Sequence, residues 1–143
     1  MQIRKVTNAE DILKCAEVIL ELRPHLKGKD LVSLYAEMVK ETFSIIYVEE
    51  GNKAVAFAGY RHLTMFFSGA TLYIDDLCTL PSHRGKGYAN LLLDHIIKEA
   101  RENSVDVVSL DSGHHRYNAH KLYLNKDFVI EGHHFHLDLK KNL

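Results

Sequence analysis

The stretch of sequence that decides the fold reads LPSHRGKGYAN and occupies residues 80–90. It follows a run of β-forming residues, Ala70–Leu80, and precedes residues 89–100, whose apolar side chains recur at helical spacing. The N–H groups in the first turn of a helix have no partner within that helix, and the helix dipole adds partial positive charge there. A glycine-rich turn with two cations at such a junction predicts an anion site suited to a pyrophosphate.

Two common phosphate-binding motifs do not match this junction. A Walker loop requires Gly where Leu80 stands, and Ser or Thr where Gly87 stands. The dinucleotide fingerprint requires a third glycine where Asn90 stands, and it belongs to the first strand of a parallel sheet. We therefore expect a different phosphate-bearing ligand.

The rest of the chain predicts the element order β-α-α-β-β-β-α-β-α-β-β. We expect strands at 2–6, 43–48, 53–65, 70–80, 105–110, 128–130 and 135–139. We expect four helices: one that ends near residue 22, one over 30–41, one that follows the glycine-rich turn, and a short one over 118–124. The three central strands form an antiparallel meander. The crossover into the strand at 105–110 is long enough to make that pair parallel.

Three motifs in this order resemble the GNAT superfamily of N-acetyltransferases. They are R-x-x-G-x-A at 84–89, the strand-into-loop segment DLCTLP at 76–81, and the segment from Ser112 to Phe128 that contains Tyr123. The resemblance covers nearly the whole chain. It implies an α/β (α+β) acyl-CoA N-acyltransferase fold with a mixed central sheet. In that fold an antiparallel N-terminal meander precedes one parallel strand pair that forms the CoA cleft, within a single domain over 1–143.

The resemblance also implies where acetyl-CoA, as co-substrate, is held. The backbone of Leu77, Cys78 and Thr79 pairs with the pantetheine arm. The pyrophosphate contacts are Arg84, Gly85, Lys86, Gly87, Tyr88, Ala89 and Asn90. Arg116 stands where many relatives have Asn, as in one branch of the family, and is a further candidate contact.

The implied reaction is transfer of acetyl to a primary amine by direct attack in a ternary complex. Tyr123 matches the acid that protonates the leaving thiolate, and Asp75 or Asp76 is the candidate base. Strand alternation puts Asp75 on the face of Tyr73 and Asp76 on the other face, unless a bulge intervenes. Alternatively, these carboxylates bind a cationic substrate or pair with Arg or Lys.

The acceptor is a small-molecule amine or a protein amine. In the resembling fold the two N-terminal helices and their connection, 22–28, cover its site. This connection is modestly basic and does not suit a polycation unless Asp30, Glu37 or Glu41 turns inward. At the other end of the chain, Asp127 stands where relatives have Gly, which predicts an unusual turn.

The composition of the chain argues against several other classes of protein. With 46% apolar and 26% charged residues and a net charge of −1, the chain shows no basic surface for nucleic acid and no membrane segment. Two cysteines form no disulfide framework, which favours the cytoplasm. Six histidines follow residue 113 without metal-ligand spacing, so we expect no metal. The rival readings are a non-catalytic acyl-CoA sensor and a metal-binding protein, and the resemblance also admits a homodimer.

Overall fold

The computed structural model describes residues 2–141 and contains two compact units, one ending at Leu110 and one beginning at Asp111. The first unit holds β1 (Ile3–Lys5), α1 (Ala9–Leu22), the short 3-10 turn η1 (Pro24–Leu26), α2 (Leu31–Val39), β2 (Ser44–Glu50), β3 (Lys53–Met65), β4 (Gly69–Thr79), the turn η2 (Pro81–His83), α3 (Tyr88–Glu102) and β5 (Val107–Leu110). The second unit holds α4 (Tyr117–Asn125).

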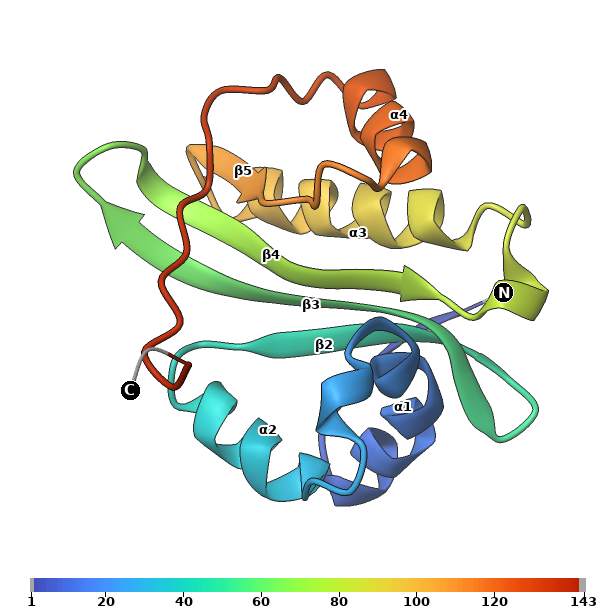
Figure 1. Ribbon diagram of the computed structural model, residues 1–143. Coiled ribbons are helices and arrows are strands. Elements are labelled where there is room, and N and C mark those ends of the chain that lie inside the picture. Colours follow the sequence, from blue (N-terminus) through green and yellow to red (C-terminus); the bar gives the residue numbers. More distant parts are fainter. Residues whose placement is uncertain (1, 142–143) are drawn as a thin grey trace. The chain divides into compact units, whose positions relative to one another are not determined.

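The first unit is built on one five-stranded sheet with the order β1-β2-β3-β4-β5 (Figure 1). Strands β1 to β4 are antiparallel neighbours, whereas β4 and β5 run parallel, with Thr71–Ile74 opposite Val107–Leu110. The predicted mixed sheet, with its meander and one parallel pair, is confirmed.

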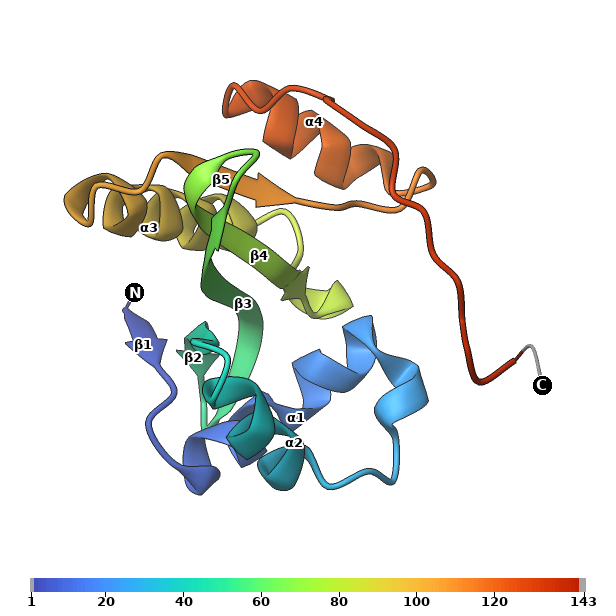
Figure 2. The same ribbon diagram turned by 90° about the vertical axis from the view of Figure 1, so that its left-hand side faces the viewer.

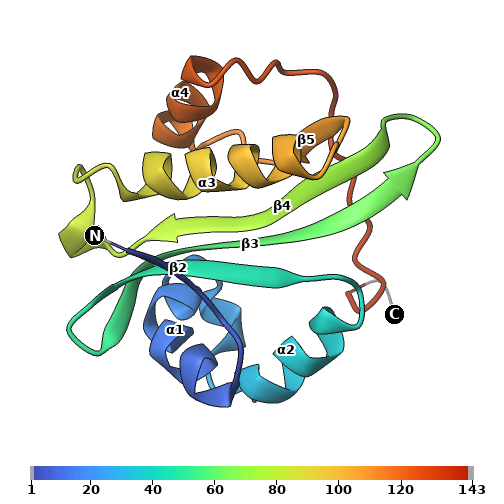
Figure 3. The same cartoon turned by 180° about the vertical axis from the view of Figure 1, so that it is seen from behind.

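Helices cover both faces of this sheet. Helices α1 and α2 lie on one face and α3 on the other, as Figures 2 and 3 show from the side and from behind. The middle strand β3 is therefore enclosed, and every residue from Ala54 to Tyr60 is buried. Enclosure on both faces explains why this segment is continuously apolar instead of alternating.

A β-bulge interrupts the pairing of β3 with β4. Gly59 lies opposite Asp76, whereas the next residue, Tyr60, lies opposite Ile74, so Asp75 is an extra residue in β4. An extra residue bends the strand and reverses the alternation of side chains beyond it.

The two expected strands after α4, at 128–130 and 135–139, are wrong: the described part of this segment contains no strand. Its apolar side chains are between 73% and 92% exposed, namely Val129, Ile130, Phe135, Leu137 and Leu139. β-forming composition stabilises a strand only when a neighbouring strand pairs with it and a core covers one face.

Candidate functional site

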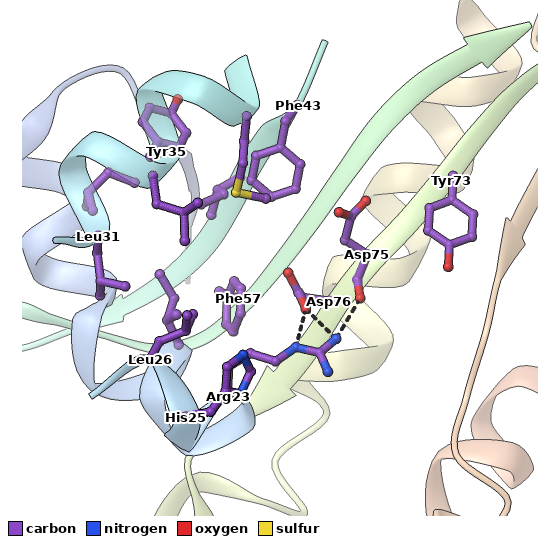
Figure 4. A pocket seen from close by; sticks show the side chains of 15 residues that line it. Arg23, His25, Leu26, Leu31, Tyr35, Phe43, Phe57, Tyr73, Asp75 and Asp76 are labelled. Atoms are coloured by element: carbon purple, nitrogen blue, oxygen red, sulfur yellow. Dashed lines mark hydrogen bonds and ion pairs between the residues drawn. The ribbon is translucent and has the colours of Figure 1, made fainter. Parts of the chain in front are cut away.

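The first unit contains a cavity of about 590 Å³ between helices α1 and α2 and the sheet (Figure 4). Most of its wall is apolar, and the polar groups come from the end of α1, from η1 and from β4. The lining residues are Ile12, Ile19, Arg23, His25, Leu26, Leu31, Leu34, Tyr35, Met38, Phe43, Ile45, Phe57, Tyr73, Asp75 and Asp76.

Both candidate bases line this cavity. Simple alternation places only Asp75 on the face of Tyr73, but the bulge turns Asp76 to that face as well. The bulge named above as the exception is present, and it moves Asp76 to the face of Tyr73 while Asp75 also lines the cavity.

Asp76 pairs with an arginine at the end of α1. Arg23 donates two hydrogen bonds to Asp76 Oδ1, from Nε at 2.9 Å and from an Nη atom at 2.7 Å, and a third to the carbonyl of Asp75 at 3.1 Å (Figure 4). Burial raises the pKa of Asp76, and the Arg23 guanidinium opposes that rise. The carboxylate therefore depends on Arg23 to remain ionised.

Asp75 pairs with an arginine of β3. Arg61 donates to both carboxylate oxygens of Asp75, at 2.9 and 2.5 Å, in the forked geometry that suits guanidinium and carboxylate. The guanidinium carbon also lies 5.2 Å from the centre of the Phe43 ring, a cation–π distance. The alternative in which these carboxylates pair with arginines therefore describes both of them.

The sequence predicts a pairing with Arg or Lys as one alternative but does not identify the partners. Arg23 belongs to the basic connection, and no motif points to Arg61. A usable signal was present for Arg61, because this charged residue directly follows the buried run 54–60 and so needs a partner.

Strand β5 covers only part of the outer edge of β4. It pairs with β4 as far as Ile74, and among residues 2–141 no further strand joins the sheet beyond β5. Because the N–H of Leu80 donates to Val55 in β3, strand alternation turns the backbone polar groups of Leu77 and Thr79 away from β3. An extended ligand can pair with this edge as an added strand, although the carbonyl of Thr79 already accepts a hydrogen bond from Arg84.

The glycine-rich turn joins this edge to α3. Gly85 and Gly87 have φ values of +80° and +84°, and no atom lies within 4 Å of where a Cβ would stand at either position. Gly87 caps α3 without a side-chain hydrogen bond, so the N–H groups of Tyr88, Ala89 and Asn90 have no capping side chain. The turn thus has the backbone geometry expected of an anion site.

The side chains of this turn divide into two groups. Lys86 is exposed, and Arg84 is exposed while its Nε donates to the carbonyl of Thr79 at 3.1 Å. Tyr88 is buried, and its hydroxyl donates to Glu50. Tyr88 can therefore offer a ligand only its backbone, whereas the two cations can supply charge.

The second unit places Tyr123 at the end of α4. Asp127 has a φ of +68°, which agrees with the unusual turn predicted there, and the N–H groups of Asp127 and Phe128 donate to Leu124 and Tyr123. This is the Schellman arrangement, and the ring centres of Tyr123 and Phe128 lie 5.9 Å apart. Burial raises the pKa of Tyr123, so its hydroxyl keeps its proton at neutral pH. Arg116 is exposed and is the N-cap residue of the same helix.

The histidines stack and hydrogen-bond locally. The rings of His134 and His136 stack at 6.4 Å, and His120 Nε2 lies 2.9 Å from the carbonyl oxygen of Gly113. Among residues 2–141, no group of three or more His, Cys, Asp or Glu side chains is arranged to hold a metal ion. Nor is any helix in this range long and apolar enough to cross a bilayer.

Comparison with known proteins agrees with this geometry. The model of the acetyltransferase (GNAT) family matches residues 10–128. The chain is 31% identical over 137 residues to an uncharacterized N-acetyltransferase of Bacillus subtilis, YhdJ, covering 94% of this chain and 96% of that protein.

Solved structures show the same fold. The aminoglycoside N-acetyltransferase AAC(6')-Iy, in complex with CoA, superposes with a TM-score of 0.83 at 15% identity, over 96% of this chain and 94% of that chain. An acetyltransferase of Trypanosoma brucei superposes with a TM-score of 0.78 at 21% identity, over 96% of this chain and 100% of that chain. The chain therefore belongs to the acetyltransferase (GNAT) family, as its motifs indicated, and acyl transfer is its general chemistry.

Proposed function

We propose that the protein, as one N-acetyltransferase domain over residues 1–143, transfers acetyl from acetyl-CoA to a primary amine by direct attack in a ternary complex. One observation carries the proposal. The edge of β4 beyond Ile74, which β5 does not cover, runs directly into a glycine turn and a helix N-terminus without a capping side chain. An extended pantetheine arm and a pyrophosphate need these two features in this order.

The residues of the turn fit a pyrophosphate. The open space at Gly85 and Gly87 lets oxygens approach the backbone, and Lys86 with Arg84 supplies full positive charge. The aminoglycoside N-acetyltransferase with this fold was solved with CoA bound, which supports the same ligand here.

The strand edge also supplies electrostatic stabilisation. A backbone N–H beside Cys78, that of Leu77 or Thr79, donates to the thioester oxygen as it gains negative charge. A preorganised donor of this kind is worth about 3–4 kcal/mol. The amine nitrogen bonds to the carbonyl carbon, and the carbon–sulfur bond then breaks to release the CoA thiolate.

Two groups handle the protons in this scheme. Asp76 accepts the proton of the amine, because burial raises its pKa and so makes it a stronger base than an exposed carboxylate. Asp75 is held by Arg61 and acts in positioning. Tyr123, assigned by the sequence signature, gives its proton to the thiolate.

The test is calorimetric titration of acetyl-CoA into the purified protein and into Arg84→Ala/Lys86→Ala. The matched control is Lys98→Ala/Arg101→Ala, which removes two exposed cations from the far end of α3. We expect micromolar binding in the parent and the control, and at least tenfold weaker binding in the turn variant. Equal loss in both double variants would refute the assignment of the turn.

Thiol release over a panel of amines then measures turnover. Release that requires an amine supports acetyl transfer. Binding of acetyl-CoA without release for any amine would instead indicate a sensor of the same fold.

A further inference from the structure

We propose that the acceptor is a compact amine with one basic nitrogen and an apolar body, such as an arylalkylamine or alkylamine, and not a polycation. This rests on the proposed function, because it assigns the cavity beside Asp75 and Asp76 to the acceptor. The inference comes from the wall of that cavity: a broad apolar surface beside one charge-neutral polar cluster.

The apolar part of the wall dominates. Nine of the fifteen lining residues have purely apolar side chains, contributed by α1, η1, α2, β2, β3 and Phe43, which directly precedes β2. A polyhydroxylated or polyamine body placed against them would lose water without gaining hydrogen bonds. An aliphatic chain or a phenyl ring gains free energy there from every methylene removed from water.

The polar part carries no surplus negative charge. Asp76 is neutralised by Arg23 at 2.7 Å and Asp75 by Arg61 at 2.5 Å. Several ammonium groups in the cavity would therefore meet the Arg23 guanidinium, which lines the wall, beside two carboxylates that are already paired with arginines. Like-charge contacts of this kind select against polycations.

The other acidic residues of the α2 region do not add negative charge to the cavity wall. Asp30 caps α2 by accepting from the N–H of Ser33. Glu37 pairs with Lys40 on the surface, and its side chain is 71% exposed. Glu41 lies 3.9 Å from Arg61, but its side chain is also 71% exposed and it does not line the cavity. The condition under which a polycation would fit, an inward-turned carboxylate from this region, is not met.

One acceptor position remains for a single amine. Both hydrogen bonds from Arg23 to Asp76 fall on Oδ1. Oδ2 lies beside Gly59, 3.4 Å from where a Cβ would stand on that residue. A primary amine that donates to Oδ2 places its body against the ring of Phe43, which covers the same glycine.

The experiment is a calorimetric titration of ethylamine, butylamine, hexylamine and 2-phenylethylamine, with spermidine and kanamycin as polycations. It uses the whole protein, with and without saturating CoA. We expect affinity to rise about fourfold for each added methylene, since each contributes about 0.8 kcal/mol. We expect hexylamine and 2-phenylethylamine to bind at least tenfold more tightly than either polycation.

A matched pair of variants tests the site. Leu34→Asp puts a carboxylate into the cavity wall, whereas Val39→Asp makes a similar change on α2 outside the lining. Leu34 and Val39 are 39% and 44% exposed, so neither change removes a core residue. Leu34→Asp flattens the chain-length series and gains affinity for spermidine, and Val39→Asp leaves both unchanged.

The outcomes separate the two proposals. Loss of CoA binding, with the amine series intact in the free protein, overturns the proposed function alone. A flat amine series, tighter binding of spermidine or kanamycin, or equal effects of the two variants overturns the inference about the acceptor, whether or not CoA binds.

Discussion

Replacement of Arg23 by Met tests how the cavity holds its buried carboxylate. The change keeps most of the side-chain volume but removes all three hydrogen bonds that Arg23 donates to Asp76 and to the carbonyl of Asp75. Asp76 then loses its hydrogen-bonded guanidinium, although its side chain is only 15% exposed. The Arg61 guanidinium, which is bonded to Asp75, acts on Asp76 only through its charge. The variant must either keep an unpaired charge in the wall or protonate it.

The size of the expected loss in stability follows from the exposure of Arg23 and Asp76. Removing one partner of a fully buried ion pair costs about 3–5 kcal/mol, and removing one from a surface pair costs about 0–1 kcal/mol. Arg23 is 41% exposed, so water replaces part of what it provides. We therefore expect a loss of about 2 kcal/mol in the free energy of unfolding at neutral pH.

The loss of stability in the Arg23→Met variant depends on pH and grows as pH rises. Burial raises the pKa of folded Asp76 above its ordinary 3.8, so its contribution to stability is complete below that value and declines as pH rises through the folded pKa. Without Arg23 the folded pKa is higher still, and the decline continues to higher pH. The difference between the variant and the parent should be smallest at about pH 4, where the loss of the hydrogen bond to the Asp75 carbonyl remains, and should reach about 2 kcal/mol at about pH 7.

Urea unfolding at both pH values measures this difference. The control is Arg4→Met, because Arg4 is 52% exposed and only 3.8 Å from Glu49, and it should cost about 0.5 kcal/mol or less at either pH. Repeating Arg23→Met in an Asp76→Asn background should abolish the pH dependence. A loss that is the same at both pH values, or a pH dependence that persists with Asn at 76, would refute the assigned pairing.

Three further substitutions test the site from other sides. Gly59→Ala should lower the free energy of unfolding by about 1–3 kcal/mol, because its Cβ would stand 2.5 Å from Cζ of Phe43. The control is Gly132→Ala, where no atom lies within 4 Å of the new Cβ, and equal unfolding midpoints for the two variants would contradict the close approach. Asp127→Gly should be more stable than Asp127→Ala by about 1 kcal/mol in thermal unfolding, because φ there is +68°, and the reverse order would exclude a strained turn. Tyr123→Phe should slow thiol release by about 10²–10⁴-fold at unchanged acetyl-CoA affinity, and an unchanged rate would remove Tyr123 from proton donation.

Local patterns in the sequence predict most of the first unit. Strand β3 begins and ends at the predicted residues, and the buried stripe of α3, Leu92, Leu93, Ile96 and Ala100, is the predicted one apart from half-buried Ala89. The glycine turn is also predictable, since the positive φ at Gly85 and Gly87 is a local requirement. Periodicity and turn chemistry act within a few residues, and a single chain displays both.

The features that the sequence does not predict depend on contacts between residues that are distant in sequence. The segments 128–130 and 135–139 have strand composition, but whether they pair is decided by a neighbouring strand that the segment itself does not encode. The partners of Asp75 and Asp76 are 14 and 53 residues away, so no local pattern joins them. These contacts define the polar side of the cavity and hence its choice of acceptor.

The bulge at Asp75 has a physical reason that the neighbouring residues reveal. Leu72 and Ile74 are buried on the face opposite Tyr73, where α3 packs, and an unbulged β4 would place Asp76 next on that face. A carboxylate among the apolar side chains of α3 would have no cation beside it, and burying it unpaired would cost several kcal/mol. One extra residue turns Asp76 instead toward Arg23, at the cost of one irregular ladder position. The same irregularity leaves Oδ2 of Asp76 toward the cavity, so the device that makes the strand foldable also supplies the base that we propose for catalysis.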